Sequence, residues 1–378
     1  MFHARTLLAA LLTLLVVSPA RAWDAHGHRT ITLLAIDRFQ AGTAPGKLDA
    51  TDQLVWLFTP ASRAQAAYQS GEPDRYRAIR NPALKHINDP DHYIDVEDLE
   101  QFGLTLRTIP PLRYEYLRAM AVSKHEHPEN AKPYNERTDF ARTLEWPGYL
   151  PYSITEHYGK LVSSFRQIRV LDKLNDPARA DQLAAARANV IYEMGQLSHF
   201  VGDAAQPLHT TTHHHGWVGD NPEGFTTNRG FHAYIDGTIL GIHTLNYENL
   251  RDACAGAPGR TVDIANPFSD TLDHIQRSFD QMRPLYVLQK SGELEKDPGK
   301  ALITERLCDG ASMLGALYLA AWQASAMADK DAQDFIKYDQ ESKPTPNPME
   351  ENRRGGTPTT PAPAAPAPAD EPAPAAKP

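Results

Sequence analysis

Apolar residues recur at three- and four-residue intervals along most of this chain, which is the period of a helix buried on one face. The period is clearest over residues 28–39, 111–122, 154–174, 178–202, 230–247, 267–288 and 301–327. Alternating strand patterns are scarce, and no hairpin dipeptide lies between β-rich runs. The pattern therefore predicts an all-α fold.

Two long stretches lack this period, at about residues 41–110 and 205–229. Loops of that length in a compact domain usually serve a function or are held by other contacts. We therefore expect a single helical domain with long loops around a functional cleft.

The first residues are typical of a secretory signal peptide. Arg5 supplies a positive charge, residues 6–17 form an apolar run, and Ala20-Arg21-Ala22 is a small-x-small cleavage site. The run is too short for a comfortable membrane span. We expect residues 1–22 to be removed, a mature chain that begins at Trp23, and a secreted or periplasmic location; a retained anchor is the alternative.

The other end is rich in Pro, Ala and Thr. Such a composition buries almost nothing, so we expect residues 344–378 to be a disordered tail, either a spacer or untethered. The single domain would then span residues 23–343.

The charge narrows the choice of partners. Cleavage would remove Arg5 and Arg21, which leaves 36 of the 38 basic residues against 47 acidic ones, a formal charge of −11. Nucleic-acid binding normally needs clustered Lys and Arg. A protein this acidic that acts on phosphates would need metal ions to supply positive charge.

The two cysteines, Cys254 and Cys308, favour a disulfide in an exported chain, with a stabilisation on the order of 4 kcal/mol. Two cysteines cannot form a structural zinc cluster. Any metal must therefore be held by His, Asp and backbone atoms.

Histidines and aspartates occur in helix-spaced pairs. His199 and Asp203 are four residues apart, as are His232 and Asp236, and both pairs lie in apolar helical segments. This spacing places both side chains on one helix face. Buried carboxylates and imidazoles are costly unless they are paired or bind a metal. Two interpretations fit this pattern: buried His–Asp pairs that hydrogen-bond to each other, or ligands of a metal ion.

The expected mature terminus adds further donors. A freed α-amino group and carbonyl oxygen at Trp23 can chelate a cation, and His28 lies five residues later. Acid-rich segments follow around Asp74 and from Asp91 to Asp98.

Taken in order, these residues resemble the trinuclear-zinc superfamily of single-strand-specific nucleases from fungi and plants and the bacterial zinc phospholipases C. The likeness extends from Trp23 to about Asp236 and rests on the order of ligand types and on the spacings around His199 and His232. The resemblance implies three zinc ions. Their ligands would be Asp74, His92, His199 and Asp203 for the first; His209, His232 and Asp236 for the second; and Trp23, His28 and a bridging Asp203 for the third. Asp89 or Asp91 is an alternative to Asp74.

The resemblance also implies the chemistry. A hydroxide bridging the first and third zinc ions would attack phosphorus, and the second ion would stabilise the leaving alkoxide. Asp74 would be catalytic as a ligand, and Arg77 would support the phosphate; a surface arginine is the alternative for Arg77.

The substrate implied is single-stranded DNA or RNA, with Tyr93 stacking on a base and Asp95 binding its edge. The alternatives are a phospholipid head group in a zinc phospholipase C, another small phosphodiester, or a periplasmic zinc-binding protein without turnover. We expect a monomer with no stable protein partner. The segment His213-His214-His215 fits neither branch, and it could contact the metal ligands, the substrate or solvent.

Overall fold

The computed structural model describes residues 23–44, 51–130 and 134–339. The expected signal peptide and Pro/Ala-rich tail lie outside these residues. The chain divides into two compact units, residues 1–329 and 330–378. The described part of the second unit belongs to one helix, α15 (Asp329–Asp339).

The first unit is helical, which confirms the predicted fold class. Its α-helices are α1 (Ala25–Gly42), α2 (Thr51–Leu54), α3 (Pro60–Gln69), α4 (Glu72–Arg77), α5 (Pro82–Asn88), α6 (Arg113–Glu126), α7 (Leu150–Leu174), α8 (Ala180–Ala205), α9 (Phe231–Ala233), α10 (Ile239–Ile242), α11 (Tyr247–Gly256), α12 (Pro267–Phe279), α13 (Met282–Ser291) and α14 (Asp297–Ala324). Short 3-10 turns are η1 (Asp89–His92), η2 (Val96–Phe102), η3 (Pro128–Asn130), η4 (Pro177–Arg179) and η5 (Pro207–Thr210), and η6 (Tyr234–Thr238) is a π-turn. Within the described ranges the β-structure is one isolated bridge, Ile94 to Gly148.

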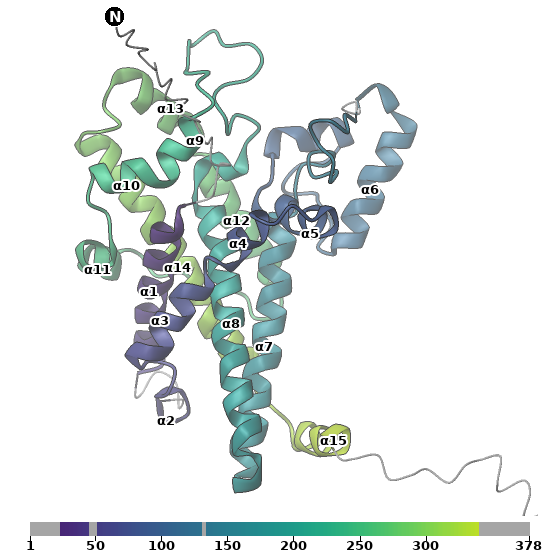
Figure 1. Cartoon of the computed structure of the whole chain (residues 1–378), viewed down its shortest axis with the longest axis vertical. Helices are drawn as coiled ribbons and strands as arrows, with labels where there is room; N and C mark the ends of the chain where they lie inside the picture. The colour runs from purple at the N-terminus through teal and green to yellow at the C-terminus, as the bar shows by residue number, and fades with distance from the viewer. Residues whose placement is uncertain (1–22, 45–50, 131–133, 340–378) are drawn as a thin grey trace, which may run out of the picture. The chain divides into compact units, whose positions relative to one another are not determined.

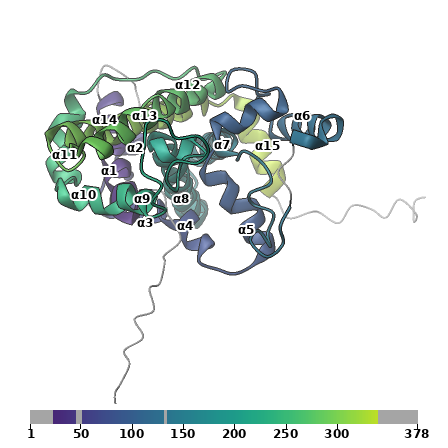
Figure 2. The ribbon, with the colours of Figure 1, turned by 90° about the horizontal axis from the view of Figure 1, so that it is seen from above.

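The long helix α8 forms the centre of the first unit. It packs against α7, α14, α3 and α1, and Figures 1 and 2 show α7 and α8 side by side. Because neighbours surround its C-terminal half, residues 194–205 are all buried. Rings from three other helices complete this core, with Phe39 6.2 Å from Phe165 and Phe165 5.3 Å from Trp322 between centroids.

The prediction that residues 41–110 form a long loop is wrong, because this stretch contains α2 to α5 and the turns η1 and η2. Three of these helices carry proline in their first turn, a position that needs no backbone N–H. Thr59 and Asn81 cap two of them by accepting hydrogen bonds from Ser62 N and Leu84 N. Helices this short bury too few residues to produce a clear period in the sequence.

Two other expected helices are interrupted. Residues 267–288 divide into α12 and α13, since Pro284 cannot donate an interior helical hydrogen bond and lies in the first turn of a new helix. Residues 230–247 divide at the π-turn η6. The stretch 205–229 is irregular after η5, as predicted.

Cys254 on α11 and Cys308 on α14 form a disulfide, which confirms the favoured pairing. It ties together two helices whose cysteines are 54 positions apart. None of the described helices is long and apolar enough to cross a membrane.

Candidate metal centre

Asp203 on α8 lies among four histidines that come from four segments of the chain. Its Oδ2 is 3.1 Å from His92 Nδ1 and 3.4 Å from His199 Nε2. The same oxygen is 3.9 Å from His209 Nδ1, and Oδ1 is 3.3 Å from His28 Nε2. All five side chains are buried. One carboxylate therefore faces imidazoles on several sides.

Helix α1 delivers His28 to this carboxylate. Asp24 starts the helix by accepting hydrogen bonds from His26 N and Gly27 N, both 2.9 Å long. His28 then stacks on His199, with ring centroids 4.0 Å apart. The two helices can approach this closely because Gly202 has no side chain, and a Cβ built there would lie 2.8 Å from His28 Nδ1.

Backbone carbonyls fix the orientation of two of the histidines. His199 Nδ1 donates to the carbonyl of Ser70 at 2.7 Å, and His209 Nδ1 donates to the carbonyl of His92 at 2.6 Å. With the proton on Nδ1, the Nε2 lone pair of each ring is left to bind a cation. The amide of Ile94 donates in return to the carbonyl of His209, at 2.9 Å, so the two loops hold each other in place.

A second cluster consists of His209, His232 and Asp236. His232 Nε2 is 3.5 Å from Asp236 Oδ2, and the rings of His209 and His232 are 4.8 Å apart. Gln206 donates to the other oxygen of Asp236, at 2.7 Å. Asp236 lies in the π-turn η6, a local irregularity that often occurs at functional sites.

The start of the described chain is attached to this second cluster. The amide of Asp24 donates to the carbonyl of Asp236 at 2.9 Å. Trp23 is fully buried, and a Cβ on Gly27 would lie 2.8 Å from the Cβ of Trp23. The residue expected to become the mature N-terminus is thus held beside the candidate ligands.

Three groups of side chains have donor atoms within 4.8 Å of one another and could hold a metal ion. They are His28, Asp74 and His199; His92, His199 and Asp203; and His209, His232 and Asp236. The third group contains the whole set expected for the second ion. In the other two groups Asp74 lies with His28 rather than with His92.

Of the three candidate acids in the 70–91 region, Asp74 is the one in such a group. Asp91 instead pairs with Arg113, at 2.7 Å. Asp89 pairs with Lys85, at 2.6 Å. Both alternatives have local cationic partners.

The polar atoms of the centre fit a cation. Buried atoms without a hydrogen-bond partner among the described residues include both ring nitrogens of His28 and of His232, Nε2 of His209, Oδ1 of Asp203 and Oδ2 of Asp236. Each such atom costs about 1–3 kcal/mol if it stays unpaired. Satisfied core His–Asp pairs would leave no such atoms. A bound cation with nitrogen and oxygen ligands would satisfy them.

Burial sets the protonation of these groups. It lowers the pKa of His199 and of His209 to about 3, so both imidazoles are neutral near pH 7, the form that binds metals. Burial also raises the pKa of Asp203 and Asp236 well above the usual carboxyl range. A nearby cation would favour their ionised forms.

The expected substrate residues lie at the edge of this centre. An Nη of Arg77 is 3.7 Å from Asp74 Oδ1. The Tyr93 hydroxyl donates to the carbonyl of Thr143 at 2.6 Å, so a hydrogen bond already fixes its position. Asp95 is buried, and its Oδ1 is 3.7 Å from His214 Nδ1.

The histidine segment 213–215 is half-buried, and contacts of its own and of the two residues before it hold it to the rest of the protein. Glu97 accepts hydrogen bonds from the Thr211 hydroxyl at 2.5 Å and from the Thr212 amide at 3.1 Å. The His213 ring stacks on Trp217 at 3.9 Å. The ring of His215 lies 5.2 Å from that of His232. The segment therefore forms part of the wall beside the second cluster.

Some contributors could not be recognised from the sequence. Gln206 and the Ser70 carbonyl orient candidate ligands, and Gly202 makes room for His28. No spacing rule identifies such contacts. Comparison of the chain with models of known protein families found no match, and comparison with curated proteins also found none.

Proposed function

We propose that this protein is a zinc-dependent phosphodiesterase that cleaves single-stranded DNA and RNA. The observation that carries the proposal is the position of Asp203 among His28, His92, His199 and His209, with the second cluster nearby. These are the residues that the resemblance to the trinuclear-zinc nucleases singles out, and they come from separate parts of the chain. Chance pairs in a helical core would not be expected to converge in this way.

Three zinc ions would be held by the nine expected residues, with Asp203 shared between two of them. Cleavage before Trp23 would free an α-amino group for one ion. The ions would supply a water of lowered pKa and would offset negative charge on the phosphate and the leaving oxygen.

The chain's own residues would position the substrate. Arg77 has a planar guanidinium group suited to a phosphate, and its nitrogens lie 3.7 Å from a carboxylate oxygen of Asp74 and 3.9 Å from one of Asp89. The ring of Tyr93, held through its hydroxyl, would stack on a base, and Asp95 would accept hydrogen bonds from the base edge.

The decisive experiment measures metal content and hydrolysis on one preparation that begins at Trp23. About three zinc ions per chain, with cleavage of single-stranded DNA and RNA, would support the proposal. Zinc with cleavage of lecithin alone would assign a phospholipase C, and zinc without hydrolysis of any phosphodiester would assign a binding protein. A preparation without zinc would refute the whole assignment.

A further inference from the structure

We propose that exposed arginines and aromatic rings of residues 80–88 and 134–146 form a surface, here called the arginine–aromatic surface, that binds the single strand beyond the cleaved bond. The inference rests on the proposed function, because it extends the substrate from one phosphodiester to a strand. Helix α4 ends at Arg77, and Arg80, three residues later, lies over the ring of Phe140 in the segment 134–146.

The segment 134–146 has a fixed position relative to the candidate metal centre. His86 on α5 contacts the carbonyl of Ala141 at 2.8 Å, and the Tyr93 hydroxyl donates to the neighbouring carbonyl of Thr143. Asp139 closes the segment on itself by accepting from the amides of Thr143 and Leu144, at 2.7 and 3.0 Å. Tyr93 directly follows the candidate ligand His92, so this segment is anchored one residue from the centre.

Cations lie over aromatic rings on this surface. The guanidinium carbon of Arg80 is 5.1 Å from the centroid of Phe140, and that of Arg142 is 3.9 Å from the centroid of Tyr134. All four of these residues are exposed. Arginine planes and aromatic rings both stack on nucleobases, and guanidinium edges bind phosphates.

The charge of the surface differs from that of the acidic chain. Among the described residues, Arg80 and Arg137 have no ion-pair partner. Of the three acids in segment 134–146, Glu145 is paired with both Lys124, at 2.7 Å, and Arg142, at 3.1 Å, Asp139 accepts from backbone amides, and Glu136 is exposed. Arg80, which has no ion-pair partner among the described residues and lies over the exposed ring of Phe140, is complementary to a polyanion with bases.

The test compares a long and a short substrate. In the mature protein, Arg80→Ala combined with Phe140→Leu should lower kcat/KM for a thymidine 20-mer by roughly tenfold, because one stacked base and one phosphate contact are lost. The same variant should hydrolyse the dinucleotide TpT within about twofold of the unchanged protein, since TpT does not extend beyond Arg77. An equal loss on both substrates, or no loss on either, would overturn the proposal.

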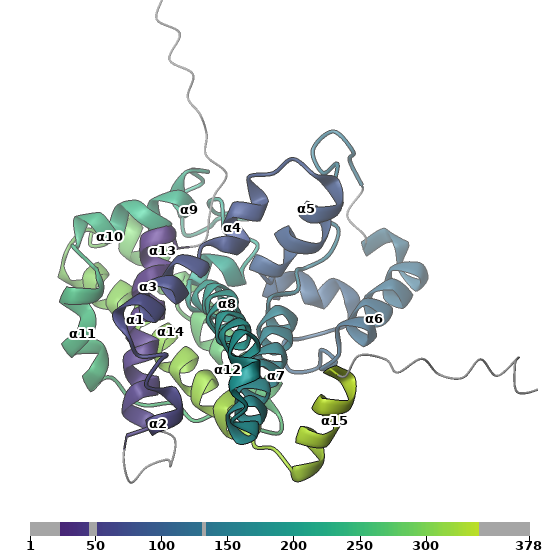
Figure 3. The same cartoon turned by 60° about the horizontal axis from the view of Figure 1, so that its bottom comes forward.

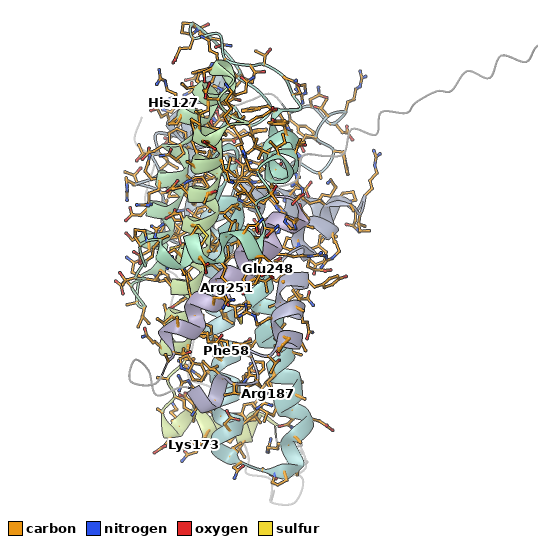
Figure 4. All side chains as sticks on the ribbon, turned by 90° about the vertical axis from the view of Figure 1, so that its left-hand side faces the viewer. Phe58, His127, Lys173, Arg187, Glu248 and Arg251 are labelled. Atoms are coloured by element: carbon orange, nitrogen blue, oxygen red, sulfur yellow. A yellow bond between two sulfur atoms is a disulfide. The ribbon has the colours of Figure 1, made fainter. Side chains whose placement is uncertain are left out.

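Arg251→Ala is the matched control. Arg251 is an exposed arginine on α11, labelled in Figure 4. Figures 1 and 3 place α11 on the opposite side of the unit from α5 and α6. This control should leave kcat/KM unchanged for both substrates. Should the double variant fold poorly in a thermal melt, Arg80→Glu alone serves the same comparison, because its side chain is exposed.

Direct binding separates this proposal from the proposed function. Anisotropy with a labelled phosphorodithioate 20-mer, which keeps its charge and resists hydrolysis, should show weaker binding for the double variant. For the double variant, the slope of the logarithm of the binding constant against the logarithm of salt concentration should become smaller in magnitude by about one, as expected for one lost phosphate contact. Strand binding that depends on Arg80 without any TpT hydrolysis would refute the proposed function alone. A loss of binding to lecithin vesicles, with strand binding intact, would overturn the strand proposal in favour of a lipid surface.

Discussion

His28 Nε2 lies 3.3 Å from Asp203 Oδ1, although the two residues are 175 positions apart and both are fully buried. Both residues lose hydration on burial, yet the two ring nitrogens of His28 and Oδ1 of Asp203 gain no hydrogen bond among the described residues. Their encounter depends on α1 packing against α8 at Gly202. This contact between two helices determines whether the centre can share one carboxylate among several histidines.

Asp203→Asn tests the shared carboxylate. The amide keeps the shape but loses the negative charge that two ions would share, so bound metal should fall by at least one ion per chain. Loss of a residue that only contacts a metal ligand lowers activity by up to about 100-fold. Loss of the ligand itself should therefore lower hydrolysis by more than about 100-fold. Metal analysis and kcat/KM for TpT measure both effects. Asp181→Asn, an exposed change at the start of the same helix, should alter neither; full metal content in Asp203→Asn would contradict the assignment.

An extra residue ahead of Trp23 tests the terminus. It moves the free α-amino group away from the centre, so a protein that begins with Gly-Trp should lose one metal ion and most of its activity. Mass spectrometry of the intact protein confirms the start, and metal analysis gives the result. An extension at the C-terminus is the control. An extended protein with unchanged metal content and turnover would remove Trp23 from the ligand set.

Gly202→Ala tests the close approach of the two helices. The new Cβ would lie 2.8 Å from His28 Nδ1, so either the ring or α1 must shift. We expect about 1–3 kcal/mol of destabilisation from overpacking, together with weaker metal binding. Gly159→Ala on α7 meets no atom within 4 Å and should be neutral or stabilising by up to about 1 kcal/mol. Urea unfolding of both variants gives the comparison, and equal effects would argue against the contact.

The buried ion network around Asp309 makes the free energy of unfolding depend on pH in the acid range. Burial raises the pKa of Asp309, but the hydrogen bond and charge of His274 and the guanidinium groups of Arg260 and Arg306 outweigh it and hold this pKa below its usual range. The folded value is therefore below the unfolded value of about 3.9. The stabilisation is complete above about pH 4 and is lost as the pH falls toward the folded value.

Asp309→Asn should thus destabilise the protein by about 3 kcal/mol at pH 7, because buried arginine charges lose their partner. The difference from the unchanged protein should shrink below about pH 4. Asp273→Asn, which breaks the exposed pair with Arg107, should cost under about 1 kcal/mol at either pH. Urea unfolding at several pH values measures these differences, and a pH-independent loss for Asp309→Asn would contradict the network.

The all-α class, the long helices and the candidate donors could be predicted because each depends on local order. Helical period identifies α7 and α8 from their own residues, and a four-residue spacing places His199 and Asp203 on one face. The short helices α3, α4 and α5 were missed. All three carry a proline in their first turn, and their stability comes from packing rather than from a period of their own: α3 and α4 pack on α8, and α5 packs on α4 and η1.

The sequence by itself thus determined the helical class, the choice of histidine and aspartate as candidate ligands, and the pairing of the two cysteines. Tertiary structure alone decided which donors meet: Asp74 rather than Asp89 or Asp91 lies beside His28, and Gln206 contacts Asp236. These contacts join segments far apart in the chain. Their geometry follows from helix packing and loop hydrogen bonds, which no local pattern encodes.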